Sequence, residues 1–388
     1  MAAPSKYRAV LGGQARAVDV GTIEHELTQL WKAAAEDTLG GQPVVRACVL
    51  NLVAYASSQA VADHIDELVS QVSGRHPSRS IVMLAEPGAR SSGLQASISA
   101  HCRIAPEGGK QVCSEQITLR ASGRAVDELH GTVLPLLVPD LPVFLWWHDE
   151  LPPTGHLFRE LLDACDRLVV DSGDFAPKHA ERALLGLQRV VEEGGAAVAD
   201  LNWSRLNPWR ELVAQFFDAA HGRQYLDRLD RIEVEVASRQ GRESRLAEGL
   251  LLVGWLASRL GWLLEGGRRS RGGAMALDFQ SAAGRIAVAI RSVTAHPGEG
   301  LNCIRLEAAG SATFAVTRVA DDQTCVAVMA EIPEGGHSHV VRMDPPSEAT
   351  LLSEELDLWV HDTVFEEALT HAVRFMDGEA NNSAVPVA

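Results

Sequence analysis

Three short apolar runs, separated by segments of helical periodicity, constrain the fold of this chain more than any other feature. The runs are 141–147, 167–171 and 196–200, and apolar residues between them recur at the spacing of a helix. Strands that read as continuous apolar runs are buried on both faces, and helices usually connect parallel strands. We therefore expect an α/β fold in which helices cover both faces of a parallel sheet.

The segments before residue 141 extend this sheet. Residues 44–56 and 80–85 are strand-like apolar runs, and the residues between them have helical periodicity, which is typical of two parallel strands joined by a helix. Residues 94–103 and 111–120 are strand-like runs around a Pro-Glu-Gly-Gly turn, which predicts a hairpin. The sequence thus predicts an N-terminal α/β domain, residues 21–200, with a mostly parallel or mixed sheet.

The C-terminal half has a different pattern. Six runs alternate between apolar and polar residues, as strands do when one face of their sheet is buried: 274–279, 285–291, 302–308, 313–319, 324–332 and 338–343. Helical patterns at 246–264 and 351–375 flank them, and we expect a flexible basic loop at 266–273. These patterns predict a C-terminal α+β domain with an antiparallel sheet at 201–376, a flexible N-terminus at 1–20 and a disordered tail at 377–388.

The charge balance narrows the function. There are 35 Lys and Arg against 51 Asp and Glu, which gives a net charge of −16. Such an acidic surface repels nucleic-acid phosphates and anionic lipid headgroups, so we expect no nucleic acid and no membrane as partners. The strongest apolar stretch, Gly249–Ala257, is too short to span a bilayer, and residues 1–13 lack an apolar run of signal-peptide length. We therefore expect a soluble, cytoplasmic protein.

No common catalytic or cofactor-binding motif occurs in the sequence. The glycine-rich dinucleotide turn, the phosphate loop, the HExxH zinc helix and the GxSxG nucleophile turn are all absent. His337 and His339 would face the same side of a strand, as metal ligands can, but no third ligand is near them in sequence. We predict no catalytic residue, no cofactor-binding residue and no metal ligand.

Tryptophans gather where the predicted parallel strands end. Six of the eight lie between residues 146 and 262, and four of these are at or just after strand ends. The carboxyl ends of parallel strands meet along one edge of a sheet, and indole and guanidinium groups are enriched in protein–protein contacts. We predict these partner-binding residues: Trp146, Trp147, Trp203, Arg205, Trp209 and Arg210. A second interpretation is that the same tryptophans pack between the two domains.

Two of the six cysteines form a candidate redox pair. The cysteines are scattered without a CxxC spacing, which argues against a disulfide framework or a structural zinc site. Cys102 and Cys113, however, are equidistant from the centre of the predicted hairpin, so simple antiparallel register would place them opposite each other. They would then form a reducible cross-strand disulfide or, alternatively, remain two small buried apolar side chains.

Several segments resemble the glucose-6-phosphate dehydrogenase assembly protein family, OpcA. The most specific are LPVFLWW at 141–147, RLVVDS at 167–172, DLNWSRLNPWREL at 200–212 and GWLASRLGW at 254–262. HPSR at 76–79 and CSEQITL at 113–119 are similar to the family's N-terminal landmarks, with Ser78 at a position where some relatives are expected to have cysteine. The resemblance runs in order from about residue 44 to residue 262.

The resemblance implies a non-catalytic protein that binds glucose-6-phosphate dehydrogenase, promotes its active oligomer and acts as an allosteric activator in the oxidative pentose phosphate pathway. Such proteins occur in cyanobacteria and actinobacteria, and redox control is associated with the cyanobacterial system, which makes thioredoxin a second candidate partner. The alternatives are a sugar-phosphate or nucleotide sensor, or an α/β enzyme. Either would bind its ligand at the strand ends beside Asp171, Ser172 and Asn202.

Overall fold

Two compact units make up the chain, and neither is continuous in sequence. Unit 1 comprises Met1–Val170, Glu193–Ala199 and Ser347–Val360, and unit 2 comprises Asp171–Glu192, Asp200–Pro346 and His361–Ala388. The computed structural model describes residues 10, 13–36, 44–104, 111–151, 155–173, 177–218, 220–237, 246–270, 274–293, 300–308 and 310–377. The expected tail beyond residue 377 and the predicted hairpin turn at 106–109 lie outside these residues.

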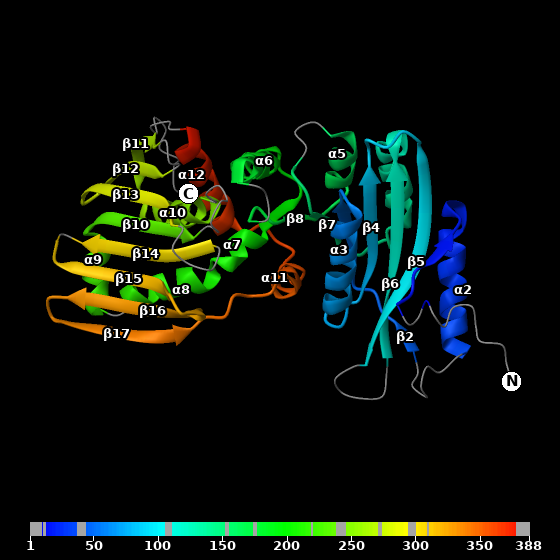
Figure 1. Cartoon of the computed structure of the whole chain (residues 1–388), viewed down its shortest axis with the longest axis horizontal. Coiled ribbons are helices and arrows are strands. Elements are labelled where there is room, and N and C mark those ends of the chain that lie inside the picture. Colours follow the sequence, from blue (N-terminus) through cyan, green and yellow to red (C-terminus); the bar gives the residue numbers. More distant parts are fainter. Residues whose placement is uncertain are drawn as a thin grey trace. The chain divides into compact units, whose positions relative to one another are not determined.

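Unit 1 is built on a mixed sheet of nine described strands in the order β1-β5-β6-β4-β3-β7-β8-β9, with β2 paired to β6 (Figure 1). The strands are β1 (Arg16–Val18), β2 (Val44–Arg46), β3 (Leu50–Ala56), β4 (Ser78–Glu86), β5 (Gly93–Ile104), β6 (Gln111–Ser122), β7 (Val143–Trp147), β8 (Arg167–Val170) and β9 (Ala197–Asp200). β3 runs parallel to β4 and β7, and β4 runs parallel to β6. The predicted mixed α/β sheet is confirmed.

Helices cover both faces of this sheet. Figure 1 shows α2 (Ile23–Glu36) and α3 (Gln59–Val72) on opposite sides of the strands. α3 begins after Ser58, whose side chain accepts a hydrogen bond from the backbone of Val61, and it buries one stripe of apolar residues. The other helices of unit 1 are α4 (His130–Val133), α5 (His156–Leu162) and α11 (Glu348–Glu355).

The predicted hairpin is confirmed in position and register. β5 and β6 are antiparallel partners, and Cys102 lies opposite Cys113. β1 pairs with the outer edge of β5, so residues 16–18 are part of the sheet although we expected residues 1–20 to be flexible.

Unit 2 contains a sheet of eight described strands in the order β11-β12-β13-β10-β14-β15-β16-β17. The strands are β10 (Leu229–Ala237), β11 (Leu263–Arg269), β12 (Met275–Ser281), β13 (Gly284–Val293), β14 (Gly300–Ala308), β15 (Ala312–Val319), β16 (Asp322–Ile332) and β17 (Gly335–Arg342). The predicted antiparallel sheet is confirmed with one exception, since β10 is parallel to β13 and antiparallel to β14.

The described helix contacts of this sheet fall on one face. The helices of unit 2 are α6 (Pro177–Glu193), α7 (Leu201–Arg205), α8 (Asn207–Asp218), α9 (Ala220–Leu226), α10 (Ala247–Leu260) and α12 (Thr363–Asp377). α10 lies close to the strands at Gly249, where an added Cβ would be 2.6 Å from the side chain of Ile290. α10 is also close to α12, because a Cβ on Gly254 would be 2.2 Å from a carbonyl oxygen of that helix.

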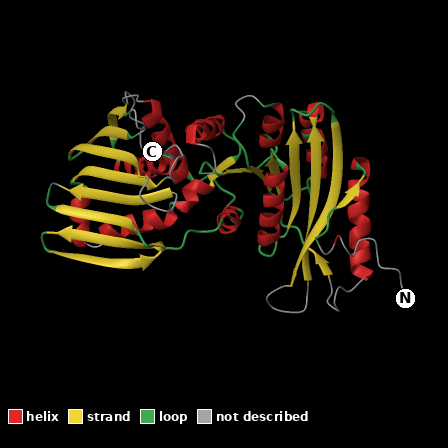
Figure 2. Ribbon diagram, viewed as in Figure 1, coloured by secondary structure: helices red, strands yellow, loops and turns green. Residues whose placement is uncertain are grey.

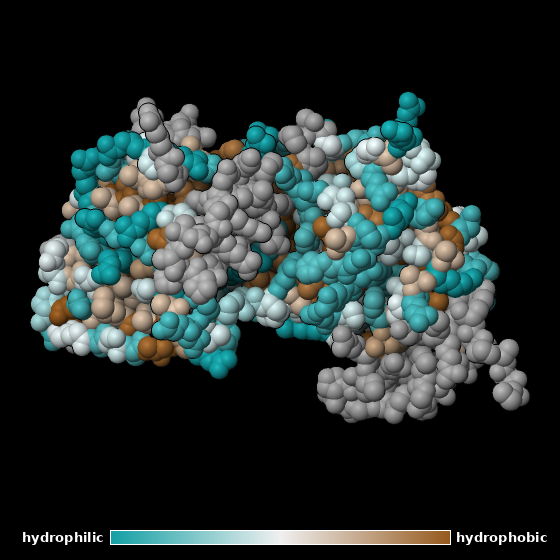
Figure 3. All heavy atoms as spheres, in the orientation of Figure 1, coloured by the Kyte–Doolittle hydropathy of each residue, from teal (hydrophilic) through white to brown (hydrophobic). Residues whose placement is uncertain are grey.

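The opposite face of the unit 2 sheet exposes alternate residues. Arg231, Arg285, Ala287 and Arg291 are exposed, whereas the alternating residues Ile232, Ile286, Val288 and Ile290 are buried. Figure 2 shows the strands on the near side of α8 and α9, and Figure 3, in the same orientation, shows hydrophilic and moderately hydrophobic residues mixed over them.

Three local expectations are wrong. The helix predicted at 246–264 ends at Leu260, because Gly261 adopts a left-handed conformation with φ of 63°. The expected basic loop begins within a strand, since β11 continues to Arg269, and residues 271–273 lie outside the described part. The helix predicted at 351–375 is two helices, α11 and α12, each capped separately by Ser347 and Asp362. No described helix is long and apolar enough to cross a membrane.

Candidate functional site

A buried polar network occupies the strand ends where the alternative sensor and enzyme interpretations place a ligand. Asp200, the last residue of β9, accepts hydrogen bonds from the backbone of Ser172 at 2.9 Å and from its hydroxyl at 2.6 Å. The backbone of Asn202 donates to the same carboxylate at 3.0 Å, and its side-chain amide donates to the hydroxyl of Ser172 at 3.0 Å. All three side chains are fully buried.

Burial controls the charge of this network. Removal from water and, to a smaller extent, the nearby charge of Asp171 raise the pKa of Asp200 to about 7, although hydrogen bonds from Ser172 and Asn202 lower it. Asp171 itself makes a two-pronged ion pair with Arg205, with one nitrogen–oxygen distance of 2.6 Å. The carboxylates therefore interact mainly with groups of the chain itself.

Asn202 has a buried polar atom that the rest of this network does not satisfy. No described residue donates a hydrogen bond to its buried Oδ1 atom. A buried amide oxygen without a donor is costly, so a ligand hydroxyl or amine is one group that could satisfy it.

Trp203 has all its polar and aromatic contacts inside unit 2. Its indole nitrogen donates to Asp362 at 3.0 Å, and the guanidinium of Arg210 lies over the ring at 3.3 Å from the centroid. Burial lowers the pKa of Arg210 to about 10, although the charges of Asp362 and Glu211 oppose that shift. This stacked pair is part of the interior of the unit rather than an open aromatic surface.

The other tryptophans predicted to bind a partner are also buried. Trp146, Trp147 and Trp209 are 0%, 3% and 2% exposed. Trp147 stacks on Tyr55 with 3.9 Å between ring centroids, and the guanidinium of Arg318 lies 5.4 Å from the ring of Trp209. Their geometry favours a supporting role, and direct partner binding by these residues stays a prediction.

A different tryptophan is exposed. Trp359 is 63% exposed, and it stands between Leu358 at 45% and Val360 at 71%. We expected this segment to be helical, but it lies between α11 and α12. The signal in the sequence was three consecutive large apolar residues, which one apolar stripe of a helix cannot bury together.

Cys102 and Cys113 are joined by a disulfide bond across the hairpin. Cys113 is fully buried and Cys102 is half-buried. The structure therefore brings the candidate redox pair together, whereas regulation through it stays a prediction.

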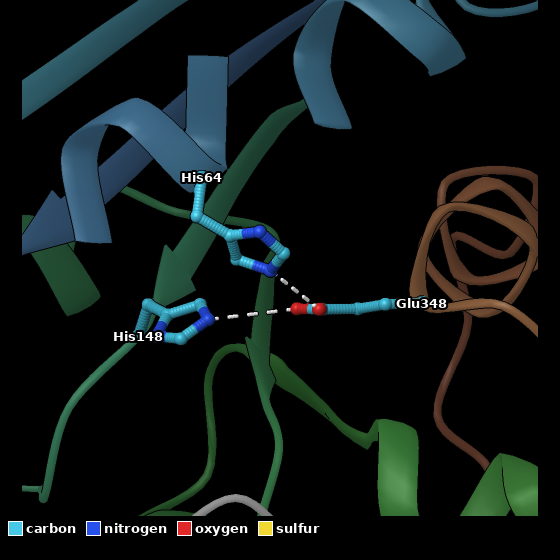
Figure 4. A group of neighbouring side chains, drawn as sticks. All are labelled: His64, His148 and Glu348. Carbon is cyan, nitrogen blue, oxygen red and sulfur yellow. Dashed lines mark hydrogen bonds and ion pairs between the residues drawn. The ribbon is translucent and has the colours of Figure 1, made fainter. Parts of the chain in front are cut away.

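Sequence reasoning missed one cluster of chemically active groups. His64, His148 and Glu348 place one imidazole or carboxylate ligand atom each within 4.8 Å of one another (Figure 4). Residues so far apart along the chain form no motif, and only the position of His148 directly after a predicted strand hinted at a role. These residues could hold a metal ion.

Two family models match the chain in order. Residues 69–189 match the model described as the glucose-6-phosphate dehydrogenase subunit N-terminal domain, and residues 196–369 match the model of its C-terminal domain, both carrying the name OpcA.

Curated relatives carry the same name. A protein of Nostoc punctiforme that is named as the OxPP cycle protein OpcA is 35% identical to this chain, over 50% of this chain and 40% of its own length. Its namesake from Synechococcus elongatus is 29% identical over 71% of this chain and 63% of its own length. The chain thus spans between about two fifths and two thirds of the curated relatives it matches.

Solved structures give only a distant likeness. An NAD binding oxidoreductase from Klebsiella pneumoniae has a TM-score of 0.49 at 12% identity, over 85% of this chain and 96% of that one. The 3-ketoreductase KijD10 from Actinomadura kijaniata has a TM-score of 0.47 at 11% identity, over 84% and 96%. We draw nothing from likenesses this distant.

Proposed function

Because the chain belongs to the OpcA family of glucose-6-phosphate dehydrogenase subunit proteins, we propose that it is a non-catalytic assembly factor and allosteric activator of that enzyme. It binds the dehydrogenase, favours its active oligomer and so raises its activity in the oxidative pentose phosphate pathway. The observation that carries this proposal is the match of both family domains, in order, to residues 69–189 and 196–369.

The turn after β3 supports a binding role over a dinucleotide-dependent activity. The strand order reverses at β3, which has β4 on one side and β7 on the other, and open α/β sheets bind nucleotides at such a point. Here the turn into α3 is Ser57-Ser58 and contains no glycine. The Ser58 side chain caps the helix through the backbone of Val61, so a donor that a phosphate would need is already used.

The strand-end carboxylates support the same conclusion. A catalytic carboxylate must reach a substrate, but Asp171 is held by Arg205, and Asp200 accepts hydrogen bonds from Ser172 and Asn202. These groups stabilise the fold of unit 2.

We propose that Leu358, Trp359 and Val360 contact the dehydrogenase directly. An exposed indole flanked by apolar side chains is the type of group that dominates protein–protein binding energy. The buried tryptophans, with Arg205 and Arg210, would instead hold the surrounding structure in shape.

Activation must come from differential binding. An activator shifts the dehydrogenase toward one oligomeric state only by the difference between its affinities for the two states, typically about 1–3 kcal/mol. The first experiment is to mix the purified proteins and measure the mass of the complex by light scattering, together with dehydrogenase activity at low substrate. Activity should rise with the concentrations of both proteins, and an unchanged mass and rate would refute the proposal.

A matched pair of variants then separates contact from support. Trp359→Ala should lower the affinity for the dehydrogenase while leaving the stability of the chain nearly unchanged, because the ring is 63% exposed. Trp209→Ala should lower stability but leave the affinity per folded molecule unchanged, because that ring is 2% exposed. The reverse result would place the contact on Trp209 and refute the role of Trp359.

We propose that the disulfide between Cys102 and Cys113 is the point of redox control, with thioredoxin as its reductant. Reduction should change the affinity for the dehydrogenase, and a variant with serine at both positions should behave like the reduced protein in either redox state. Equal affinities of the oxidised and reduced wild-type proteins would rule this control out.

A sugar-phosphate sensor is the second candidate, and Asn202 is the observation that favours it. Its buried Oδ1 atom lies beside Asp200, whose raised pKa is typical of functional sites. Calorimetry with glucose 6-phosphate in the absence of the dehydrogenase distinguishes the two candidates, because only a sensor would bind the sugar on its own.

A further inference from the structure

We propose that His64, His148 and Glu348 form a binding site for a divalent transition-metal ion, and that Zn²⁺ is the ion that fits this ligand set best. The site is independent of the proposed assembly function. It lies wholly within unit 1, since Ser347–Val360 belongs to that unit.

Three elements of secondary structure bring the ligands together. His64 lies on the exposed side of α3, His148 follows the last residue of β7, and Glu348 is the first residue of α11. α3 and α11 are in contact. Figure 4 shows both imidazoles pointing toward the carboxylate. Ligands on packed helices and at a strand end are held more firmly than ligands on loops.

One of the two histidine–carboxylate distances already matches the spacing between ligands of a metal ion. The Nε2 atom of His64 is 2.7 Å from one oxygen of Glu348, and the Nε2 atom of His148 is 3.5 Å from the other. Two ligand atoms of a tetrahedral zinc ion, each about 2.0–2.1 Å from the metal, are about 3.3–3.5 Å apart. His64 is the ligand that must move most, and its side chain is 44% exposed, so it is free to do so.

The donor types select the metal. Two imidazoles and one carboxylate form a set of three protein ligands that leaves a fourth position for water. Imidazole favours zinc and its neighbours, whereas Mg²⁺ and Ca²⁺ prefer oxygen ligands. Glu348 and His148 are each 16% exposed, so the ion would be partly shielded, and the negative charge of the chain favours cation entry.

The position of the cluster in the sheet is a second observation that points to a ligand. β3 is the strand at which the order of the parallel strands reverses, with β7 on one side and β4 on the other. Open α/β sheets bind ligands at the carboxyl ends of the strands that flank such a point. His148 directly follows β7, and His64 is carried by the helix that follows β3.

Other polar contacts already hold α11 on unit 1. Arg75 pairs with Asp357, and the Nε2 atom of His76 is 2.8 Å from the hydroxyl of Ser353. Loss of one metal ligand should therefore leave the unit folded, which makes ligand variants usable as a test.

The test is metal binding by the full chain after removal of metals with a chelator. Co²⁺ should bind at one ion per chain with the visible absorption of a four-coordinate site, Zn²⁺ should displace it, and Mg²⁺ should not. Since even outer-shell partners of a metal usually contribute about 10–100-fold to its affinity, loss of the direct ligand in Glu348→Gln or His64→Ala should weaken binding by at least about 100-fold.

A matched control comes from the exposed pair His337 and His339 on β17, whose rings are 6.2 Å apart. Replacing both with alanine should leave the Co²⁺ spectrum and affinity unchanged. Circular dichroism of each variant checks that it is folded. The proposal is overturned if the wild type and His64→Ala bind Co²⁺ equally, or if the β17 variant loses the ion. It is also overturned if the wild type shows no saturable binding of Co²⁺, which would mean that the three residues only hydrogen-bond to one another.

Discussion

Replacing Asp200 with asparagine should change how the stability of the protein depends on pH. Asp200 is fully buried, and burial raises its pKa from 3.8 to about 7. Asparagine keeps the shape and an acceptor oxygen for the backbone of Ser172 and Asn202, but it has no charge to bury. The variant thus removes the titration and keeps most of the hydrogen bonds.

The sign and size of this effect on stability follow from the raised pKa of Asp200 in the folded state. The folded state binds the proton of Asp200 more tightly than the unfolded state, so this residue lowers stability as the pH rises from its unfolded pKa to its folded one. Between pH 5 and pH 8 the difference in proton binding integrates to about two pH units, or about 3 kcal/mol at roughly 1.4 kcal/mol per unit. The wild type should lose about this much relative to Asp200→Asn.

Urea unfolding at pH 5 and at pH 8, followed by tryptophan fluorescence, measures the effect. The stability of Asp200→Asn minus that of the wild type should be about 3 kcal/mol more positive at pH 8 than at pH 5. Asp163→Asn is the matched control at an exposed position. A difference for Asp200→Asn that is constant, or that falls with pH, would show that this carboxyl group does not titrate as a buried acid.

Three further predictions concern stability. Glu355→Ala should lower the free energy of unfolding, measured by urea denaturation, by about 3–5 kcal/mol. The substitution removes the carboxylate that lies 2.5 Å from the guanidinium of the buried Arg167. Gly254→Ala should lower the melting temperature, with a loss of about 1–3 kcal/mol in the free energy of unfolding, because the new methyl group would overlap a carbonyl oxygen of α12. An unchanged melting temperature would mean that α10 and α12 can move apart without cost. Replacing Cys102 and Cys113 by serine should remove about 3 kcal/mol more stability under oxidising conditions than when dithiothreitol is present throughout.

The strands could be predicted because burial on one or both faces of a strand produces a recognisable pattern of apolar residues in the local sequence. A strand covered on both faces, such as β7, is a continuous apolar run, and the symmetry of the hairpin was enough to place Cys102 opposite Cys113. The parallel pairing of β10 with β13 was not predictable, because the alternation of a half-buried strand is the same for either direction of its neighbour.

Helix ends and side-chain clusters could not be predicted from the spacing of apolar residues alone. The helical spacing continues from α11 to α12, but α11 ends at Glu355 and a new cap at Asp362 starts α12. The tryptophan pattern located the strand ends but not the direction of the rings, and most of these large side chains turned inward. The cluster of His64, His148 and Glu348 joins residues that only the folded chain brings together.

The division of the chain into two interleaved units has a consequence for its biosynthesis. The polypeptide passes from one unit to the other five times, and residues 347–360 belong to the unit that begins at the N-terminus. Unit 1 therefore lacks α11 until residues 200–346 of unit 2 have been synthesised, and no single proteolytic cut releases either unit whole. Until then, the nascent chain should expose the surface of α3 that α11 contacts in the folded unit.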